Sequence, residues 1–86
     1  MRSVTTIRFR KCYEHLPNEI QLAAKKAYKL WQMNPYSSGL DFKKIHPGEI
    51  YSIRITLSYR ALAIKEEDVF IWFWLGSHSD YDKMIS

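Results

Sequence analysis

The chain has 86 residues, a formal net charge of +4 and a single cysteine. Because typical domains contain about 100–200 residues, this length predicts one domain over residues 1–86 with one modest core. A lone cysteine excludes an internal disulfide, and without a CxxC pair or a Cys/His cluster we expect no structural zinc. There is no apolar run of about 18 residues and no signal-peptide core. We therefore expect a cytoplasmic protein without membrane contact, whose positive charge favours an anionic partner.

The first half of the chain predicts a strand followed by a helix. Residues 3–10, SVTTIRFR, are rich in β-branched residues and alternate in part, which is typical of a strand. From Pro17 to Met33 the apolar positions recur at helical spacing, with lysines on the other side. At the start of this helix, either Pro17 occupies the first turn, or Asn18 is the N-cap and Gln21 completes a capping box.

The second half predicts consecutive strands. A short strand is possible at 40–45, the segment 51–56 alternates cleanly, and 59–64 and 69–75 flank a charged turn. Segment 69–75 is apolar on both faces, which indicates a strand that is central in the sheet or covered on both sides. The expected fold class is therefore α+β, with an antiparallel sheet of four strands, or five if 40–45 is included, packed against one long N-terminal helix. Residues 80–86 can form one or two helical turns or remain irregular.

Two arginines are candidates for a phosphate-binding site. Alternation turns Arg54 to the sheet face opposite Tyr51, Ile53 and Ile55. Arg60 begins the next strand, and two arginines on adjoining strands can converge on one phosphate. Arg60 also shares its face with Leu62 and Ile64, so its direction is left open. The plainer alternative is that both arginines are solvated or take part in ordinary ion pairs.

His78 and Tyr81 follow the last predicted strand, just after Gly76. Imidazole exchanges protons near neutral pH, and a helical turn would put Tyr81 on the same side as His78. The pair is thus a candidate for proton transfer. The alternatives are that it anchors the C-terminal segment by packing, or that Ser79 or Asp80 is the N-cap of a short helix.

The other polar candidates are weaker. His15 and His46 are expected on the surface, His46 in the turn HPG, and no metal site follows from them. Lys43 and Lys44 could contact a nucleic-acid backbone, although solvation at a strand end is the default. Glu49 is expected to be an exposed carboxylate.

The longest distinctive stretches are FRKCYEHLPNEIQLAAKKAYKLWQMNP, LDFKKI, YSIRITLSYRALA and IWFWLGSHSDYDKMI. In this order and spacing, over about residues 7–85, they resemble the RelE/ParE superfamily of toxins from bacterial type II toxin–antitoxin systems. The arginines of SIRI and SYRALA match basic positions of RelE-like toxins, and the Gly-x-His ending of WLGSHSDYD is shared with many members. The resemblance implies a small twisted antiparallel sheet backed by N-terminal helices.

The resemblance also implies one of two activities. RelE-like members cut mRNA in the ribosomal A site without a metal, whereas ParE-like members bind and poison DNA gyrase. As a RelE-like endoribonuclease the chain would need no cofactor, and its partners would be ribosome-bound mRNA and a cognate antitoxin. Its expected RNA-binding residues are Lys43 and Lys44, and its expected catalytic residues are Arg54, Arg60, His78 and Tyr81. In a gyrase inhibitor these arginines would be solvated or structural and the helix surface would be the working face; an inactive relative is a third alternative.

Two positions depart from the family pattern. Ser52 stands where a second basic residue is often found, and His78 lies near the position where the best-known members carry arginine. His78 would then act as in histidine-bearing relatives. The apolar surplus at Phe70, Trp72, Phe73 and Trp74 is expected to be mostly core and in part a contact for the antitoxin. The nuclease hypothesis requires Arg54, Arg60 and His78 to meet around one phosphate-sized hollow.

Overall fold

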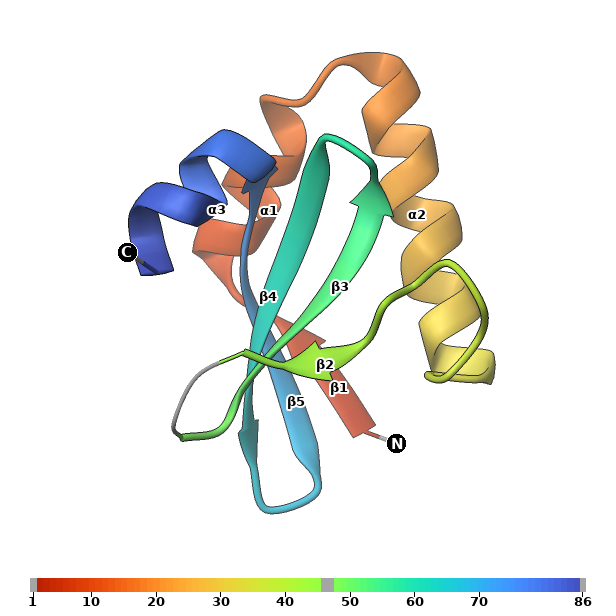
Figure 1. Ribbon diagram of the computed structural model, residues 1–86, viewed down its shortest axis with the longest axis vertical. Coiled ribbons are helices and arrows are strands. Elements are labelled where there is room, and N and C mark those ends of the chain that lie inside the picture. Colours follow the sequence, from red (N-terminus) through yellow and green to blue (C-terminus); the bar gives the residue numbers. More distant parts are fainter. Residues whose placement is uncertain (1, 46–47, 86) are drawn as a thin grey trace.

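The computed structural model describes residues 2–45 and 48–85, and Figure 1 shows a twisted sheet with α2 on one side of the view and α3 on the other. Its elements are β1 (Arg2–Thr5), α1 (Ile7–Glu14), α2 (Asn18–Met33), β2 (Lys43–Lys44), β3 (Ile50–Thr56), β4 (Tyr59–Glu66), β5 (Val69–Ser77) and α3 (His78–Ile85). None of the helices in this described part is long and apolar enough to cross a membrane. The α+β class expected from the sequence is confirmed.

The first strand is shorter than the sequence predicts. The prediction of a strand through residue 10 is wrong, because β1 ends at Thr5 and residues 7–10 begin α1. Thr6 caps this helix, since its Oγ1 accepts a hydrogen bond from the Phe9 backbone N–H at 3.1 Å. Phe9, Cys12 and Tyr13 then pack against the core at the spacing of one helix face. Tertiary packing therefore overrides the local two-residue alternation.

Helix α2 has the predicted apolar face but a different start. Pro17 is its N-cap, and no side chain caps it by a hydrogen bond. The capping box, one of the two alternatives for this start, does not form, because Gln21 Nε2 instead donates to the Tyr13 carbonyl at 2.9 Å and ties α2 to the end of α1. Its buried residues are Ala24, Ala27 and Trp31.

The sheet has the order β1-β5-β4-β3-β2. The expected antiparallel pairing holds for β2 to β5, but β1 runs parallel to β5. β5 thus lies between two strands, in agreement with its apolar sequence on both faces. The strand expected at 40–45 is reduced to β2, and residues 46–47 of the predicted HPG turn, including His46, lie outside the described residues.

The principal core lies on the sheet face that carries Ile53, Ala61 and Leu75, which are neighbours across β3, β4 and β5. Trp31 of α2 is fully buried at its centre, and its ring centroid lies 5.0 Å from that of Trp72 and 5.1 Å from that of Phe70. These edge-to-face aromatic contacts hold α2 against the sheet.

A second, smaller cluster occupies the opposite face. Leu62 and Trp74 are cross-strand partners on β4 and β5, and Tyr81 of α3 packs on both. The pairing of β4 with β5 is irregular between Leu62 and Ala63. This cluster places the start of α3 beside the β3–β4 hairpin, where the candidate residues lie.

Candidate functional site

Strands β3 and β4 bring Arg54 and Arg60 together. The two residues are direct cross-strand partners in the antiparallel ladder. Such partners have Cα atoms about 4.5–5.5 Å apart and side chains on the same face. This is also the face of Ser52 and Leu62, which form another cross-strand pair.

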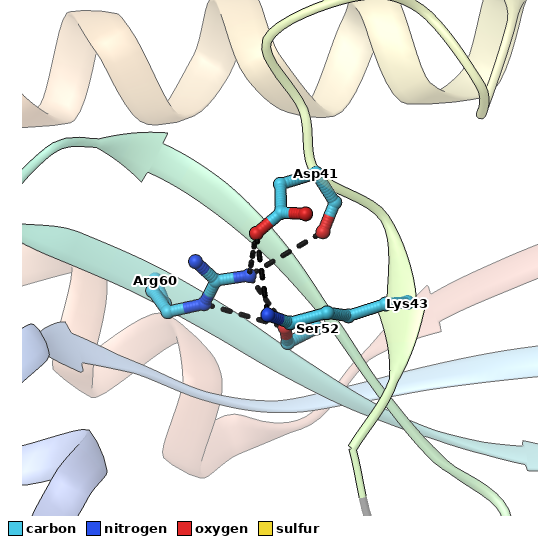
Figure 2. Close-up of polar contacts among 4 residues, drawn as sticks. All are labelled: Asp41, Lys43, Ser52 and Arg60. Atoms are coloured by element: carbon cyan, nitrogen blue, oxygen red, sulfur yellow. Dashed lines mark hydrogen bonds and ion pairs between the residues drawn. The ribbon is translucent and has the colours of Figure 1, made fainter.

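Arg60 is almost buried, with 7% of its surface exposed. Its Nη2 donates to Ser52 Oγ at 2.8 Å, to Asp41 Oδ2 at 3.2 Å and to the Asp41 carbonyl at 3.3 Å. Its Nε also donates to Ser52 Oγ, at 3.3 Å. Figure 2 shows this guanidinium facing Asp41 and Ser52, to which dashed lines join it. Arg60 is therefore held in place by an internal ion pair and is not open to solvent as it stands.

Asp41 carries the counter-charge from the segment that precedes β2. Its backbone has φ of 47°, a left-handed conformation that Asp tolerates better than most residues. The segment is fixed beside it, because Leu40 is buried and its carbonyl accepts a hydrogen bond from the Arg54 backbone N–H. Partial burial raises the pKa of Asp41, but the hydrogen bond from Arg60 and the charge of Lys43 lower it by more, so its pKa lies below the ordinary value.

The two candidate lysines lie on β2 and have different environments. Lys43 pairs with Ser52 across the strands, and its Nζ lies 3.4 Å from Asp41 Oδ2, so it joins the Arg60 cluster. Lys44 is the next residue along the strand, and its Nζ lies 3.5 Å from Glu49. Glu49 is exposed, as expected from the sequence.

Helix α3 supplies the aromatic partner of Arg60. The Tyr81 side chain is buried, and the Arg60 guanidinium carbon lies 5.4 Å from the centroid of its ring. This distance allows a cation–π contact. The His78 ring stacks on the same tyrosine, with centroids 5.7 Å apart. Tyr81 thus connects the buried arginine to an exposed imidazole.

The start of α3 is fixed by local hydrogen bonds. Ser77 Oγ accepts a hydrogen bond from the Asp80 backbone N–H at 3.1 Å, so Ser77 is in the capping position that the sequence suggested for Ser79 or Asp80. The His78 backbone N–H donates to the Ser58 carbonyl at 2.6 Å, which joins α3 to the β3–β4 turn. The His78 Nε2 lies 3.5 Å from Asp82 Oδ2, one helical turn further along.

Arg54 is only partly buried, and its surroundings differ from those of Arg60. Its Nε is buried and has no hydrogen-bond partner within residues 2–45 and 48–85. Arg54 lines a small hollow between β3 and α2, together with Lys26, Ala27 and Gly39. A larger groove lies along α1, with Arg8, Lys11 and His15 beside Leu16, Trp74 and Leu75. Neither lining includes Arg60 or His78.

The family assignment rests on a match over most of the chain. A model of the ParE-like toxin domain matches residues 18–83. The chain belongs to this family. It is a toxin of the RelE/ParE superfamily, as the sequence resemblance implied. No curated protein matches the chain significantly.

Solved structures show that this toxin has the RelE-like fold. The RelE chain of an antitoxin–toxin complex from Methanococcus jannaschii is 21% identical with a TM-score of 0.76, and the match covers 96% of this chain and 99% of that one. The RelBE2 toxin–antitoxin complex of Mycobacterium tuberculosis gives 17% identity, a TM-score of 0.70 and coverages of 90% and 96%. The isolated RelE toxin of E. coli is 17% identical with a TM-score of 0.67, and the match covers 99% of this chain and 98% of that one.

The structure brings most, but not all, of the predicted site residues of the toxin together. Arg54 adjoins Arg60, and a chain of contacts runs from Lys43 through Asp41 and Arg60 to Tyr81 and His78. Lys44, by contrast, is paired with Glu49. The expectation of one shared hollow is not met, because Arg60 is packed against Asp41 and Arg54 lines a separate hollow.

Sequence reasoning missed Asp41 and the role of Ser52. Asp41 is 19 residues from Arg60 along the chain and lies in a segment without clear periodicity. Ser52 stood out as a departure from a basic residue, and in the structure its hydroxyl accepts two hydrogen bonds from Arg60. Within the described residues, no cluster of three or more His, Cys, Asp or Glu side chains could hold a metal ion.

Proposed function

We propose that this toxin is a ribosome-dependent mRNA endoribonuclease of the cytoplasm that needs no metal. The observation that carries the proposal is the contact chain His78–Tyr81–Arg60, with Arg54 beside Arg60. This chain links an exposed imidazole, through the Tyr81 ring, to the Arg60 guanidinium, and Arg54 is the cross-strand neighbour of Arg60 although its side chain lines a separate hollow. The similar RelB–RelE complexes support a cognate antitoxin as a further partner.

These groups match the needs of RNA cleavage. The 2′-oxygen of the ribose attacks phosphorus as the bond to the 5′-oxygen breaks, which gives a 2′,3′-cyclic phosphate; the imidazole takes the proton of the 2′-hydroxyl, and solvent supplies the proton that the departing 5′-oxygen receives. His78 is the proton-transfer group in this proposal, and Asp82 at 3.5 Å orients its ring. Arg54 and Arg60 balance the negative charge that develops on the phosphate.

Tyr81 is assigned a positioning role. Its ring contacts both His78 and Arg60, and it is buried, which suits a support better than a group that must reach substrate. Tyr81→Phe keeps the ring and should retain most activity, whereas Tyr81→Leu should lower kcat because it removes both ring contacts. Equal losses in the two variants would instead assign the phenol group a direct part in the reaction.

The test uses purified toxin, ribosomes and a defined message, with cleavage followed by mapping new 5′ ends. His78→Ala should reduce cleavage by about 10²–10⁴-fold, the usual contribution of a positioned acid–base group. His15→Ala is the matched control, because His15 is also exposed but lies on the α1 groove. An absence of cuts in translated codons with the parent toxin would refute the proposal, as would equal activity of the two variants.

Gyrase inhibition is the second candidate, and the surface of α2 favours it. Leu22 and Met33 are 68% and 75% exposed, and their spacing of about three turns places them on one side of the helix. Arg60 would then be a purely structural ion-pair partner of Asp41. Under this hypothesis the parent toxin causes DNA breaks while mRNA stays intact, and Leu22→Lys relieves growth arrest without loss of folding.

A further inference from the structure

The Asp41 carboxylate is bound in the way that a phosphate oxygen would be bound. Its Oδ2 lies 3.2 Å from Arg60 Nη2 and 3.4 Å from Lys43 Nζ, so one oxygen accepts from a guanidinium and an ammonium group. The two cations come from β4 and β2, and Figure 2 shows both directed at this carboxylate. Guanidinium and ammonium groups bind carboxylate and phosphate oxygens by the same charge-assisted hydrogen bonds.

The guanidinium does not depend on the carboxylate for its position. Ser52 Oγ accepts hydrogen bonds from its Nε and Nη2, at 3.3 and 2.8 Å, and the Asp41 carbonyl accepts another from Nη2 at 3.3 Å. Tyr81 supports the group through its ring face. If the carboxylate rotated away, these contacts would still hold Arg60, and the place opposite Nη2 would become available to another anion.

The carboxylate itself is the more exposed partner. The Asp41 side chain is 36% exposed, against 8% for that of Arg60, so it can turn into solvent without moving the sheet. Its backbone is fixed on one side by the buried Leu40. A rotation of this side chain would remove its carboxylate from Arg60 Nη2 and Lys43 Nζ.

We propose that Asp41 occupies the binding place of a substrate phosphate between Arg60 and Lys43, and that an incoming RNA phosphate displaces it. The toxin is then held closed by its own carboxylate until substrate is present. This inference rests on the proposed nuclease function for the identity of the anion, and it assigns Arg60, Lys43 and Ser52 to one phosphate subsite. Lys44 is left out of this subsite, because its Nζ lies beside Glu49 and not beside Asp41.

The test measures anion binding separately from cleavage. Inorganic sulfate is titrated into ¹⁵N-labelled toxin while the Arg60 Nε–H resonance is followed by NMR. Asp41→Asn should bind sulfate roughly three- to tenfold more tightly than the parent, the gain expected from removing a half-exposed competing carboxylate. Glu49→Gln is the matched control, because it removes one negative charge from the ion pair with Lys44, the neighbour of Lys43. The sulfate affinity of this variant should stay within about twofold of that of the parent.

The outcomes separate this inference from the proposed function. If Asp41→Asn binds sulfate no more tightly than Glu49→Gln, or if the Arg60 resonance does not respond, the phosphate subsite is refuted even when the parent toxin cuts RNA. If Asp41→Asn gains affinity while neither form cuts RNA, the anion site stands and the nuclease assignment fails. Should Asp41→Asn not fold, Asp41→Gly gives the same decision, since glycine accepts the positive φ and also lacks the carboxylate.

Discussion

Gly76 provides a sharp test of the packing beside the site. It is the cross-strand partner of Arg60 on β5, and its φ is not in the left-handed region. Alanine would therefore suit the backbone, and a Gly→Ala change at such a position usually stabilises a protein by about 0.4–1 kcal/mol. Here, however, a Cβ would lie 2.5 Å from Cζ2 and 2.9 Å from Cη2 of Trp74. The indole is rigid and buried in one cluster with Leu62 and Tyr81, so it cannot move without disturbing that cluster.

We therefore expect Gly76→Ala to lower the free energy of unfolding by about 1–3 kcal/mol, the usual cost of overpacking. Each kcal/mol of lost stability lowers the Tm of a domain of this size by about 4–8 °C, so the change is measurable. The assay is urea unfolding followed by far-UV circular dichroism, in the parent and in a Trp74→Phe background. The smaller ring leaves room for the methyl group, so the loss should shrink or disappear in that background. An equal loss in both backgrounds would refute the clash as the cause.

Three further outcomes are expected. Trp31→Ala should cost about 3–5 kcal/mol in urea unfolding, because it empties the centre of the principal core; a loss below 1 kcal/mol would contradict the described packing. Ser77→Ala should lower the free energy of unfolding by about 0.5–2 kcal/mol, because it removes the hydroxyl that caps α3 by accepting from the Asp80 N–H. Ser79→Ala is the near-neutral control. Because the pKa of Asp41 is lower in the folded chain, its stabilising effect is complete above the unfolded-state value of about 3.9 and is lost as pH falls through the folded-state value. As pH falls below about 4, the free energy of unfolding should consequently decline less in Asp41→Asn than in the parent. Parallel curves of unfolding free energy against pH for the two proteins would disprove this.

The sequence predicts the regular elements where one physical signal dominates. The apolar stripe of α2 and the alternation of β3 indicate both elements, because each buries a single face. Helix α1 is not predicted in this way, because Ile7 and Phe9 alternate with arginines as they would in a strand. Only the Thr6 cap and packing against the core favour a helix here. The parallel pairing of β1 with β5 is likewise set by the completed sheet.

The candidate site shows the same division between local and long-range causes. The His78–Tyr81 pair can be anticipated because three-residue spacing brings side chains together once a helix forms. The adjacency of Arg54 and Arg60 follows from a short hairpin. The partner of Arg60 could not be found in this way, because Asp41 reaches it only after the segment before β2 has closed over the sheet.

The position of β5 has a consequence for how the toxin is made. This strand lies between β1 and β4, yet it leaves the ribosome after both of them. Until it arrives, β1 has no neighbour with which to pair, and the closure joins segments far apart in the chain, which slows folding. His78 and Tyr81 emerge later still. The sheet is therefore complete only once this last region has been translated, and a shorter chain lacks the strand that joins β1 to the rest.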